Sequence, residues 1–263
     1  MLVLFIGDIV GKPGREAVRV VLPDLIKTLC IDVVMANAEN IAHGTGATPP
    51  LIKKLEAEGV HLFSLGNHAW RHPEMIKGID ALPSVARPAN FSTHAPGKGR
   101  AVYTLPDGRP CTLINLIGRV FMEPANCPFD AIERELDSRT GDSPFIFVDV
   151  HAEATSEKAA LAWHLDGRCS AVLGTPTHVQ TADERILPGG TAFISDVGMC
   201  GPYNSILGVK SELVLKKSIT GLPVKWEIAD GPVQFNAVLV ETDDRTGRAI
   251  SVKRIQQILQ LDS

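Results

Sequence analysis

Cysteine is scarce and unpaired in this chain of 263 residues. The five cysteines are an odd number, and no Cys-x-x-Cys spacing occurs among them. A disulfide framework uses an even set of cysteines, and zinc sites built on cysteine use closely spaced pairs. The sequence therefore predicts free thiols, no cysteine-based metal site and a reducing compartment, the cytoplasm.

Long apolar runs and a surplus of positive charge are also missing. No apolar stretch approaches the roughly 20 residues that cross a bilayer. The N-terminus lacks the basic segment of a signal peptide and reaches an acid at Asp8. The formal net charge is -4, and aromatic residues make up only 5% of the chain. We therefore expect no membrane partner and no general binding to DNA.

The composition is otherwise that of an ordinary globular protein. Hydrophobic residues make up 44% of the chain and charged residues 21%, values that are common in folded domains. The length suits one large α/β domain or two small ones. Because no linker, low-complexity segment or clear internal repeat divides the sequence, we expect a single domain over residues 1–263.

Short apolar runs alternate with helical patterns in the N-terminal part of the chain. The predicted order is strand 2–6, loop 11–14, helix 15–29, strand 31–36, helix 49–58 with Thr48 as its N-cap, and strand 60–65. Strands and helices that alternate in this way form βαβ units around a parallel sheet. The sequence therefore predicts an α/β fold with a mostly parallel first sheet.

The remainder of the chain continues with further strands and helices. The predicted elements are a hairpin over 101–116, helices at 73–79, 131–138 and 156–165, and strands at 144–150, 169–173 and 191–195. In the tail, 224–228 and 233–241 are predicted to be antiparallel strands. The dipeptide Gly231-Pro232 between them is typical of a turn.

Polar side chains follow the ends of five predicted strands. They are Asp8, Glu39, Asn40, Asn67, His68, His151 and His178. The carboxyl ends of parallel strands meet at one edge of a sheet, where α/β proteins bind their ligands. Carboxylate, amide and imidazole groups suit Mn, Fe, Zn or Mg rather than soft metals. The sequence therefore predicts a metal site, and a carboxylate flanked by His and Asn can bridge two ions about 4 Å apart.

Other conspicuous side chains have simpler explanations. Glu153, Glu157 and Lys158 are predicted to form the solvated start of a helix, with a position near the site as the alternative for Glu153. Trp70 and Trp163 are expected to pack against the protein rather than to bind substrate. Loops or exposed helix faces are expected for His43, His61, His72, His94 and His164.

Several short motifs along the chain are known together from one protein family. They are Gly7-Asp8, Glu39-Asn40, Gly66-Asn67-His68, Arg87-Pro-Ala-Asn90, His151-Ala-Glu-Ala-Thr-Ser-Glu-Lys158 and Thr177-His-Val-Gln-Thr-Ala-Asp183. From Met1 to about Gly208 the sequence resembles the YmdB-like branch of the calcineurin-type metallophosphoesterases. The block that begins at His151 is highly specific, whereas the Gly-Asn-His turn belongs to the wider superfamily.

This resemblance implies a fold, a cofactor and an activity. The implied fold is a four-layered α/β/β/α metallophosphoesterase-like sandwich, and the implied cofactor is a pair of divalent or trivalent ions, often assigned iron. The implied activity is phosphodiesterase, with 2′,3′-cyclic nucleotides as the best-known substrates. Carried over by position, the expected roles are one ion on Asp8, Asn40 and His178, a second ion on Asn67 and His151, a bridge at Glu39 and a proton donor at His68.

One position departs from the family pattern. The family has Gly-Thr-His-Thr-His near its last ligand, and this chain has Gly174-Thr-Pro176-Thr-His178. Proline has no side-chain donor atom, so Pro176 cannot replace the imidazole that would bind the second ion. That ion is then held more weakly, completed by water, or absent. Thr175 or Thr177 offers only a hydroxyl, which is a poor substitute.

Two functions remain open from the sequence. The first is a metal-dependent phosphodiesterase or phosphatase, in which a metal-activated hydroxide attacks phosphorus and His68 is the general acid. The second is a regulatory protein on the same scaffold that binds a metal or a nucleotide and turns over little, because of Pro176. Arg87 either contacts the substrate phosphate or forms a structural salt bridge. The expected partner is a small phosphodiester or nucleotide, and a homo-oligomer is compatible with the sequence.

Overall fold

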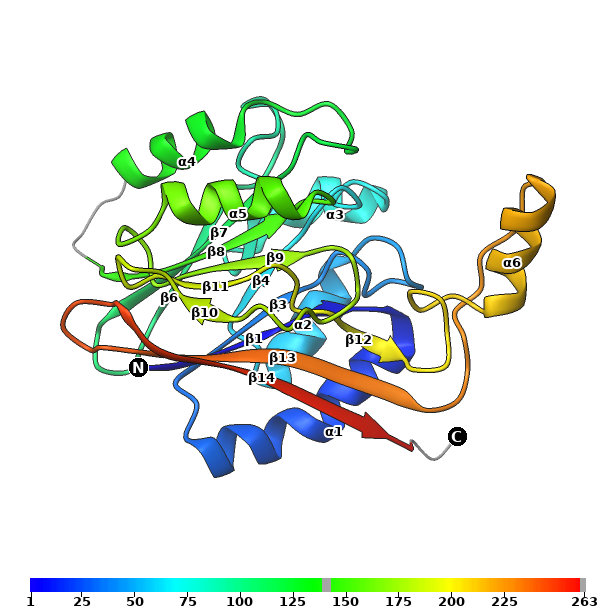
Figure 1. Cartoon of the computed structure of the whole chain (residues 1–263), viewed down its shortest axis with the longest axis horizontal. Helices are drawn as coiled ribbons and strands as arrows, with labels where there is room; N and C mark the ends of the chain where they lie inside the picture. Colours follow the sequence, from blue (N-terminus) through cyan, green and yellow to red (C-terminus); the bar gives the residue numbers. More distant parts are fainter. Residues whose placement is uncertain (139–142, 261–263) are drawn as a thin grey trace.

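Two β-sheets lie face to face between outer helices in the computed structural model, which describes residues 1–138 and 143–260 (Figure 1). The first sheet has eight strands in the order β2 (Asp8–Ile9), β12 (Met199–Pro202), β13 (Val233–Thr242), β1 (Leu2–Ile6), β3 (Val33–Asn37), β4 (Leu62–Ser64) and β5 (Val85–Ala86), with β14 (Ala249–Leu259) beside β13. Strands β1, β3, β4 and β5 are parallel, whereas β13 is antiparallel to its neighbours.

The second sheet has six strands with a parallel centre. Their order is β10 (Arg185–Ile186), β11 (Ala192–Ile194), β9 (Ala171–Thr175), β8 (Phe145–His151), β7 (Pro110–Ile117) and β6 (Arg100–Thr104). Strands β7, β8, β9 and β11 are parallel, and the two edge strands are antiparallel to their neighbours. Strand β8 is buried along its whole length, as expected for an apolar strand covered on both faces.

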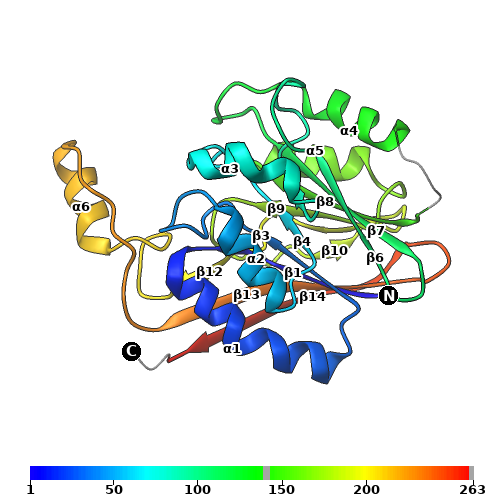
Figure 2. The same ribbon diagram turned by 180° about the vertical axis from the view of Figure 1, so that it is seen from behind.

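Helices cover the outer face of each sheet (Figures 1 and 2). The helices are α1 (Gly11–Leu29), α2 (Pro49–Ala57), α3 (Pro73–Gly78), α4 (Pro128–Asp137), α5 (Thr155–His164) and α6 (Ser211–Thr220), with a 3-10 turn at Ile79–Ala81. Three apolar cores separate the layers: one lies under α1 to α3, one between the sheets, and one under α4 and α5. The predicted four-layered α/β/β/α sandwich is therefore confirmed, while the expectation of a single domain over 1–263 stays a prediction.

The first helix begins earlier than predicted. We expected a loop at 11–14, but α1 starts at Gly11 and includes Pro13 and Gly14. A proline in the first turn of a helix has no N–H to leave unpaired, so it does not prevent the helix. A Cβ on Gly14 would lie 2.2 Å from the carbonyl oxygen of Cys200. The glycine therefore marks close packing of α1 on β12, not a loop.

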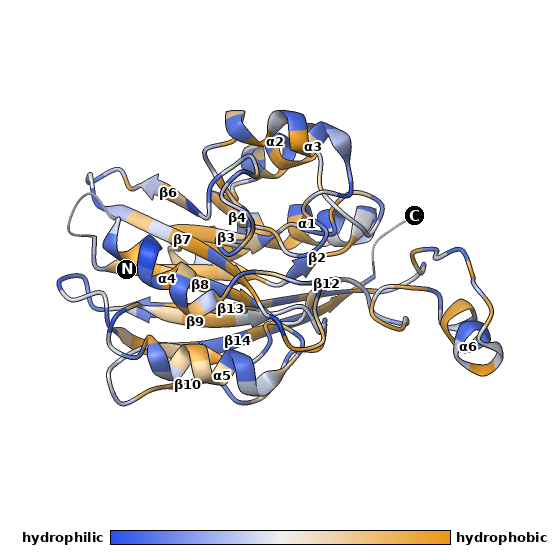
Figure 3. Ribbon diagram, turned by 90° about the horizontal axis from the view of Figure 1, so that it is seen from above, coloured by the Kyte–Doolittle hydropathy of each residue, from blue (hydrophilic) through white to orange (hydrophobic). Residues whose placement is uncertain are grey.

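The tail differs most from the prediction. The segment 224–228 is not a strand; only Ile228 forms an isolated bridge, with Val209. Its alternating apolar residues resemble a strand, but no further strand pairs with it. Helix α6 was not predicted at all, has no buried residues, and projects from the body in both views (Figures 1 and 2). In Figure 3 it carries both hydrophobic and hydrophilic residues well away from the sheets.

Three expectations about single side chains are wrong. Trp163 is exposed on α5, although we expected it to pack. The His61 ring is half-buried, accepts the backbone N–H of Val34 at 3.0 Å and stacks on Tyr103. Lys158 is buried rather than solvated. These positions depend on neighbours from distant parts of the chain, which local periodicity does not reveal.

All five cysteines lie within the described residues and are free. Burial raises the pKa of the thiols of Cys111 and Cys200. The helices of residues 1–138 and 143–260 include none that is long and apolar enough to cross a bilayer.

Candidate metal centre

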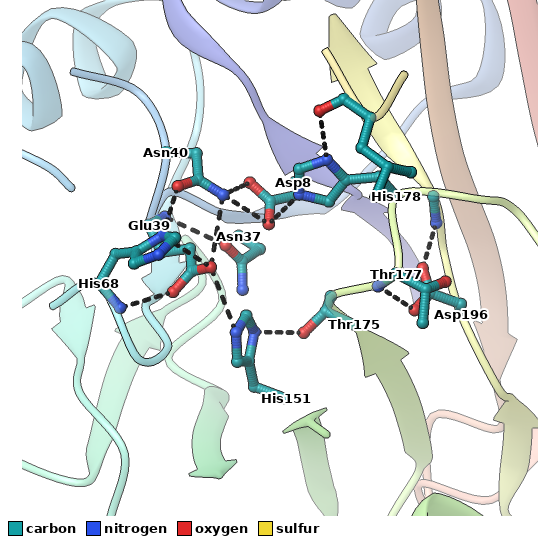
Figure 4. A network of polar contacts seen from close by, with 12 residues as sticks. Asp8, Asn37, Glu39, Asn40, His68, His151, Thr175, Thr177, His178 and Asp196 are labelled. Carbon is teal, nitrogen blue, oxygen red and sulfur yellow. Dashed lines mark hydrogen bonds and ion pairs between the residues drawn. The ribbon is translucent and has the colours of Figure 1, made fainter. Parts of the chain in front are cut away.

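The predicted site residues meet at one edge of the two sheets (Figure 4). Parallel strands bring them there: β1 and β3 run side by side, as do β8 and β9, and the polar residues follow their carboxyl ends. Most of these side chains are buried, and His68 and His178 are partly exposed. The structure brings together seven of the predicted residues: Asp8, Glu39, Asn40, Asn67, His68, His151 and His178.

Asp8 is the centre of a first group of polar contacts. Its Oδ2 lies 3.2 Å from Nε2 of His178. The Asn40 amide donates to both Asp8 oxygens, at 3.0 and 3.1 Å. In this orientation the Asn40 amide nitrogen faces the two carboxylates and its Oδ1 faces His68. The group thus supplies a carboxylate, an imidazole and an amide on one side of the site.

Glu39 is the centre of a second group. Its Oε1 lies 3.2 Å from Nε2 of His151, and that same nitrogen is 3.0 Å from Oδ1 of Asn67. Asn40 also donates to Glu39 Oε1, at 3.3 Å, and thereby connects the two groups. Glu39 is therefore the carboxylate that both groups share.

Hydrogen bonds at the far side of two imidazoles fix which nitrogen faces the carboxylates. His178 Nδ1 lies 3.1 Å from the carbonyl oxygen of Leu207, which can only accept, so Nδ1 carries the proton. Thr175 donates its hydroxyl to Asp149 at 2.8 Å and accepts from His151 Nδ1 at 2.8 Å. In both rings Nε2 is consequently the atom available for a metal ion, a common arrangement for metal-binding histidines.

The acidic and imidazole side chains of the site stabilise one another's charged forms. Burial alone would lower the pKa of His151, but the charge and hydrogen bond of Glu39 raise it to about 9. Burial likewise lowers the pKa of His178, and the charge of Asp8 outweighs this and raises it to about 9. For Glu39, burial raises the pKa, and the nearby charge of His151 overcomes this and lowers it to about 2. The carboxylates thus hold positive charge at Nε2, where a metal ion can replace the proton.

The donor set fits metal ions only if the amides take part. Among the described residues, no three His, Cys, Asp and Glu side chains are arranged to hold a metal ion by themselves. The site instead pairs one carboxylate with one imidazole twice, and Asn40 and Asn67 complete the two groups. Oxygen and nitrogen donors of this kind suit Fe, Mn, Zn or Mg.

His68 lies at the exposed rim of this group. Its Nδ1 is 2.7 Å from Oδ1 of Asn40, and its backbone N–H donates to Glu39 at 3.0 Å. Because an amide oxygen only accepts, Nδ1 is the protonated donor in this arrangement. The second ring nitrogen, Nε2, is then the one available to a bound molecule.

Arg87 is the one predicted residue that the structure does not bring to the site. Its guanidinium is buried and donates to the carbonyl oxygens of Pro88 at 2.7 Å and of Pro96 at 3.2 Å. Burial lowers the pKa of this arginine. Its contacts hold the loop that follows β5.

Several supporting residues were missed from the sequence. Asp149 is fully buried in β8 and accepts from Asn37, Ser64 and Thr175. Burial raises its pKa to about 6. The signal was an acid inside the apolar run Phe145–His151, since a buried acid needs hydrogen-bond partners.

Lys158 and Asp196 form a second buried support. Lys158 Nζ lies 3.2 Å from Asp196 Oδ2 and donates to the carbonyl oxygen of Thr175 at 3.3 Å. The same Asp196 oxygen accepts the backbone N–H of Thr177 at 2.9 Å. The pair therefore holds both sides of Pro176, in the loop that leads to His178.

A family model described as YmdB-like protein matches residues 4–255. The chain belongs to this family. Over 255 residues it is 45% identical to the 2′,3′-cyclic-nucleotide 2′-phosphodiesterase of Bacillus subtilis (strain 168), covering 97% of this chain and 96% of the relative. The resemblance noted in the sequence is therefore confirmed.

Two solved structures have the same fold. The crystal structure of a hypothetical protein from Thermus thermophilus has a TM-score of 0.92 and 41% identity, covering 98% of this chain and 99% of its own. A novel phosphatase from Mycoplasma pneumoniae also has a TM-score of 0.92, with 32% identity over 99% of this chain and 94% of its own. The predicted enzyme class, a phosphoesterase hydrolase, agrees with these relatives, and such a family uses divalent metal ions in general.

Proposed function

We propose that this YmdB-like chain is a metal-dependent phosphodiesterase that hydrolyses small phosphodiesters such as 2′,3′-cyclic nucleotides. The observation that carries the proposal is the shared carboxylate Glu39, which lies between two groups of oxygen and nitrogen donors. The activity for which the Bacillus subtilis relative is named supports the choice of substrate. We further propose the cytoplasm as its location.

The proposed ligands follow from the two polar groups. Asp8, Asn40 and His178 would hold one ion, Asn67 and His151 would hold the other, and Glu39 would bridge the two. When bound, Fe, Mn, Zn or Mg ions supply Lewis-acid activation of the phosphoryl group and of the attacking water.

The chain's own contribution to the chemistry centres on His68. Its Nδ1 is engaged by Asn40, so the imidazolium form carries the transferable proton on Nε2. From the rim of the site, that proton passes to the leaving alkoxide oxygen as the P–O bond breaks. Glu39 is close by, with Oε1 3.4 Å from His68 Nδ1.

The test compares wild type with His68→Ala on 2′,3′-cyclic AMP, with Mn or Fe supplied. A lost general acid lowers kcat by about 10²–10⁴-fold, and metal content measured by elemental analysis should stay unchanged. His94→Ala is the matched control, because His94 lies exposed in a surface loop. Equal kcat values for wild type and His68→Ala would rule out the acid role.

The second candidate function is a metal- or nucleotide-binding regulator with little turnover, and Pro176 is the observation that favours it. The hydroxyl of Thr175 is engaged by Asp149 and His151, so it is not free to replace a missing ligand. Elemental analysis of wild type and Pro176→His separates the candidates. If wild type holds two ions per chain and hydrolyses the substrate rapidly, the regulatory function is excluded. If two ions and rapid hydrolysis are found only in Pro176→His, the regulatory function is favoured.

A further inference from the structure

An apolar pocket of about 290 Å³ opens beside the candidate metal centre. The loop at 43–45 forms one wall, and the segment 206–228, which includes α6, forms the other. The apolar side chains that line it are Ile206, Leu207, Val209, Val214, Trp226 and Ile228. Its volume is close to the lower end of small-molecule pockets, about 300 Å³.

Both walls of this pocket connect directly to predicted metal ligands. Leu207 lines the pocket, and its carbonyl oxygen accepts the hydrogen bond from Nδ1 of His178 at 3.1 Å. On the other side, the 43–45 loop begins three residues after Asn40. The pocket therefore adjoins the predicted metal ligands through Leu207 and through the loop that follows Asn40.

The chemistry of the lining suits a flat, mostly apolar ring with polar edges. Trp226 is 46% exposed and lines the pocket, and Nζ of Lys217 lies over its ring, 4.9 Å from the ring centroid. Val209 and Ile228 are apolar and half-buried. His43, Thr45 and Glu227 add hydrogen-bonding groups. Aromatic faces bind nucleobases by stacking, and they do so with little dependence on the base.

We propose that this pocket binds the nucleobase of the substrate, with Trp226 as the residue that contacts the ring. The inference rests on the proposed function and deepens it, because it selects nucleotides over simple phosphodiesters. Its hydrogen-bonded link to His178 through Leu207 supports this assignment. It also gives a role to the projecting segment around α6, since Val214 of that helix forms part of the wall.

The test uses two substrates that differ only in the base. Wild type and Trp226→Ala are assayed on 2′,3′-cyclic AMP and on the 2′,3′-cyclic phosphate of methyl riboside. The ratio of kcat/KM for the nucleotide to that for the base-free substrate should fall about 10-fold in Trp226→Ala, the size expected for one lost stacking contact. Trp163→Ala is the matched control, because Trp163 is 53% exposed on α5.

A second measurement tests the pocket without turnover. Isothermal titration with adenosine 2′-monophosphate should give a dissociation constant about 10-fold weaker for Trp226→Ala than for wild type and Trp163→Ala. If wild type hydrolyses neither substrate, the proposed function fails, and this titration still decides on the pocket.

Two results would overturn the pocket assignment. One is a Trp226→Ala variant in which kcat/KM falls equally on both substrates while the dissociation constant for the nucleotide stays unchanged. The other is a change in the molar mass of Trp226→Ala, measured by light scattering, with no change in the ratio of kcat/KM between the two substrates. That result would mean that the pocket is a contact between copies of the chain.

Discussion

Gly66 occupies the narrow space between the two charged partners of the second polar group. A Cβ at this position would lie 2.3 Å from Oε2 of Glu39 and 2.4 Å from Nε2 of His151. The constraint is one of space, because Gly66 is not among the glycines with a positive φ. The turn therefore needs glycine so that an acid from one sheet and an imidazole from the other can meet.

Gly66→Ala should accordingly disturb the site more than the fold. Overpacking of this kind typically costs about 1–3 kcal/mol of unfolding free energy, and we expect phosphodiesterase activity and metal content to fall together. Urea unfolding, kcat/KM and elemental analysis measure the three quantities. Gly108→Ala is the control: its new Cβ meets nothing within 4 Å, although its φ of +89° adds strain. Full activity in Gly66→Ala would contradict the proposed roles of Glu39 and His151.

Sequence reasoning found the residues that line the site but missed those that hold them. Asn67 and His151 follow apolar strands, so the topology of a parallel sheet predicts where they lie. Asp149 and Lys158 support these residues from behind, and their burial depends on strands and helices that are distant in the sequence. Local patterns carry no information on such partners.

At the scale of elements, one buried ion pair fastens α5 to the segment after β11. Lys158 lies in α5, and Asp196 follows β11. Asp196 also accepts the backbone N–H of Gly198, whose carbonyl oxygen accepts the N–H of Asp8. The pair thus links an outer helix to the backbone on which Asp8 lies.

Lys158→Met should be strongly destabilising, because it leaves the Asp196 carboxylate buried without its cation. Removal of one partner of a buried pair costs about 3–5 kcal/mol, measured as unfolding free energy in urea. The double variant Lys158→Met/Asp196→Asn should recover part of that loss. Lys210→Met is the control, since its pair with Glu227 is exposed and solvent screens the attraction, so the unfolding free energy should change little. Equal effects of Lys158→Met and Lys210→Met would contradict this account.

The elements that the sequence predicted well are those with a local signature. The apolar strands from Leu2, Val33 and Phe145 are fully or almost fully buried, and continuous apolar runs identify such strands. Helix α6 has no such signature, because it buries no residue and needs no apolar face. Very short strands, such as β2 and β10, are defined only by the partner that they pair with.

At the scale of the whole molecule, the candidate centre joins the two sheets. Asp8 and Glu39 belong to the first sheet and its loops, whereas His151 and the segment leading to His178 belong to the second. Ions held by all four residues would cross-link the sheets at one edge. Ligands that bind only the native state stabilise it by mass action.

Removal of metal ions with a chelator should therefore lower the Tm of the whole chain. At a free metal concentration of 100 Kd the stabilisation is about 2.7 kcal/mol, which corresponds to roughly 5–10 °C for a chain of this size. Differential scanning calorimetry before and after EDTA, and after metal is added back, measures it. An unchanged Tm in protein shown by elemental analysis to have lost its metal would argue against a centre shared by both sheets.

The unpacked helix α6 also marks a place where the chain can be cut in two. No residue of α6 is buried, and a segment with few tertiary contacts opens at little cost and is a preferred site of protease nicking. Trypsin should cleave first at Lys216 or Lys217. The chain after the cut returns as β13, which pairs with β1, β12 and β14 and contributes to two apolar cores. The two fragments should therefore stay together without a covalent link. Expressed as two separate chains divided within α6, they should associate through the first sheet.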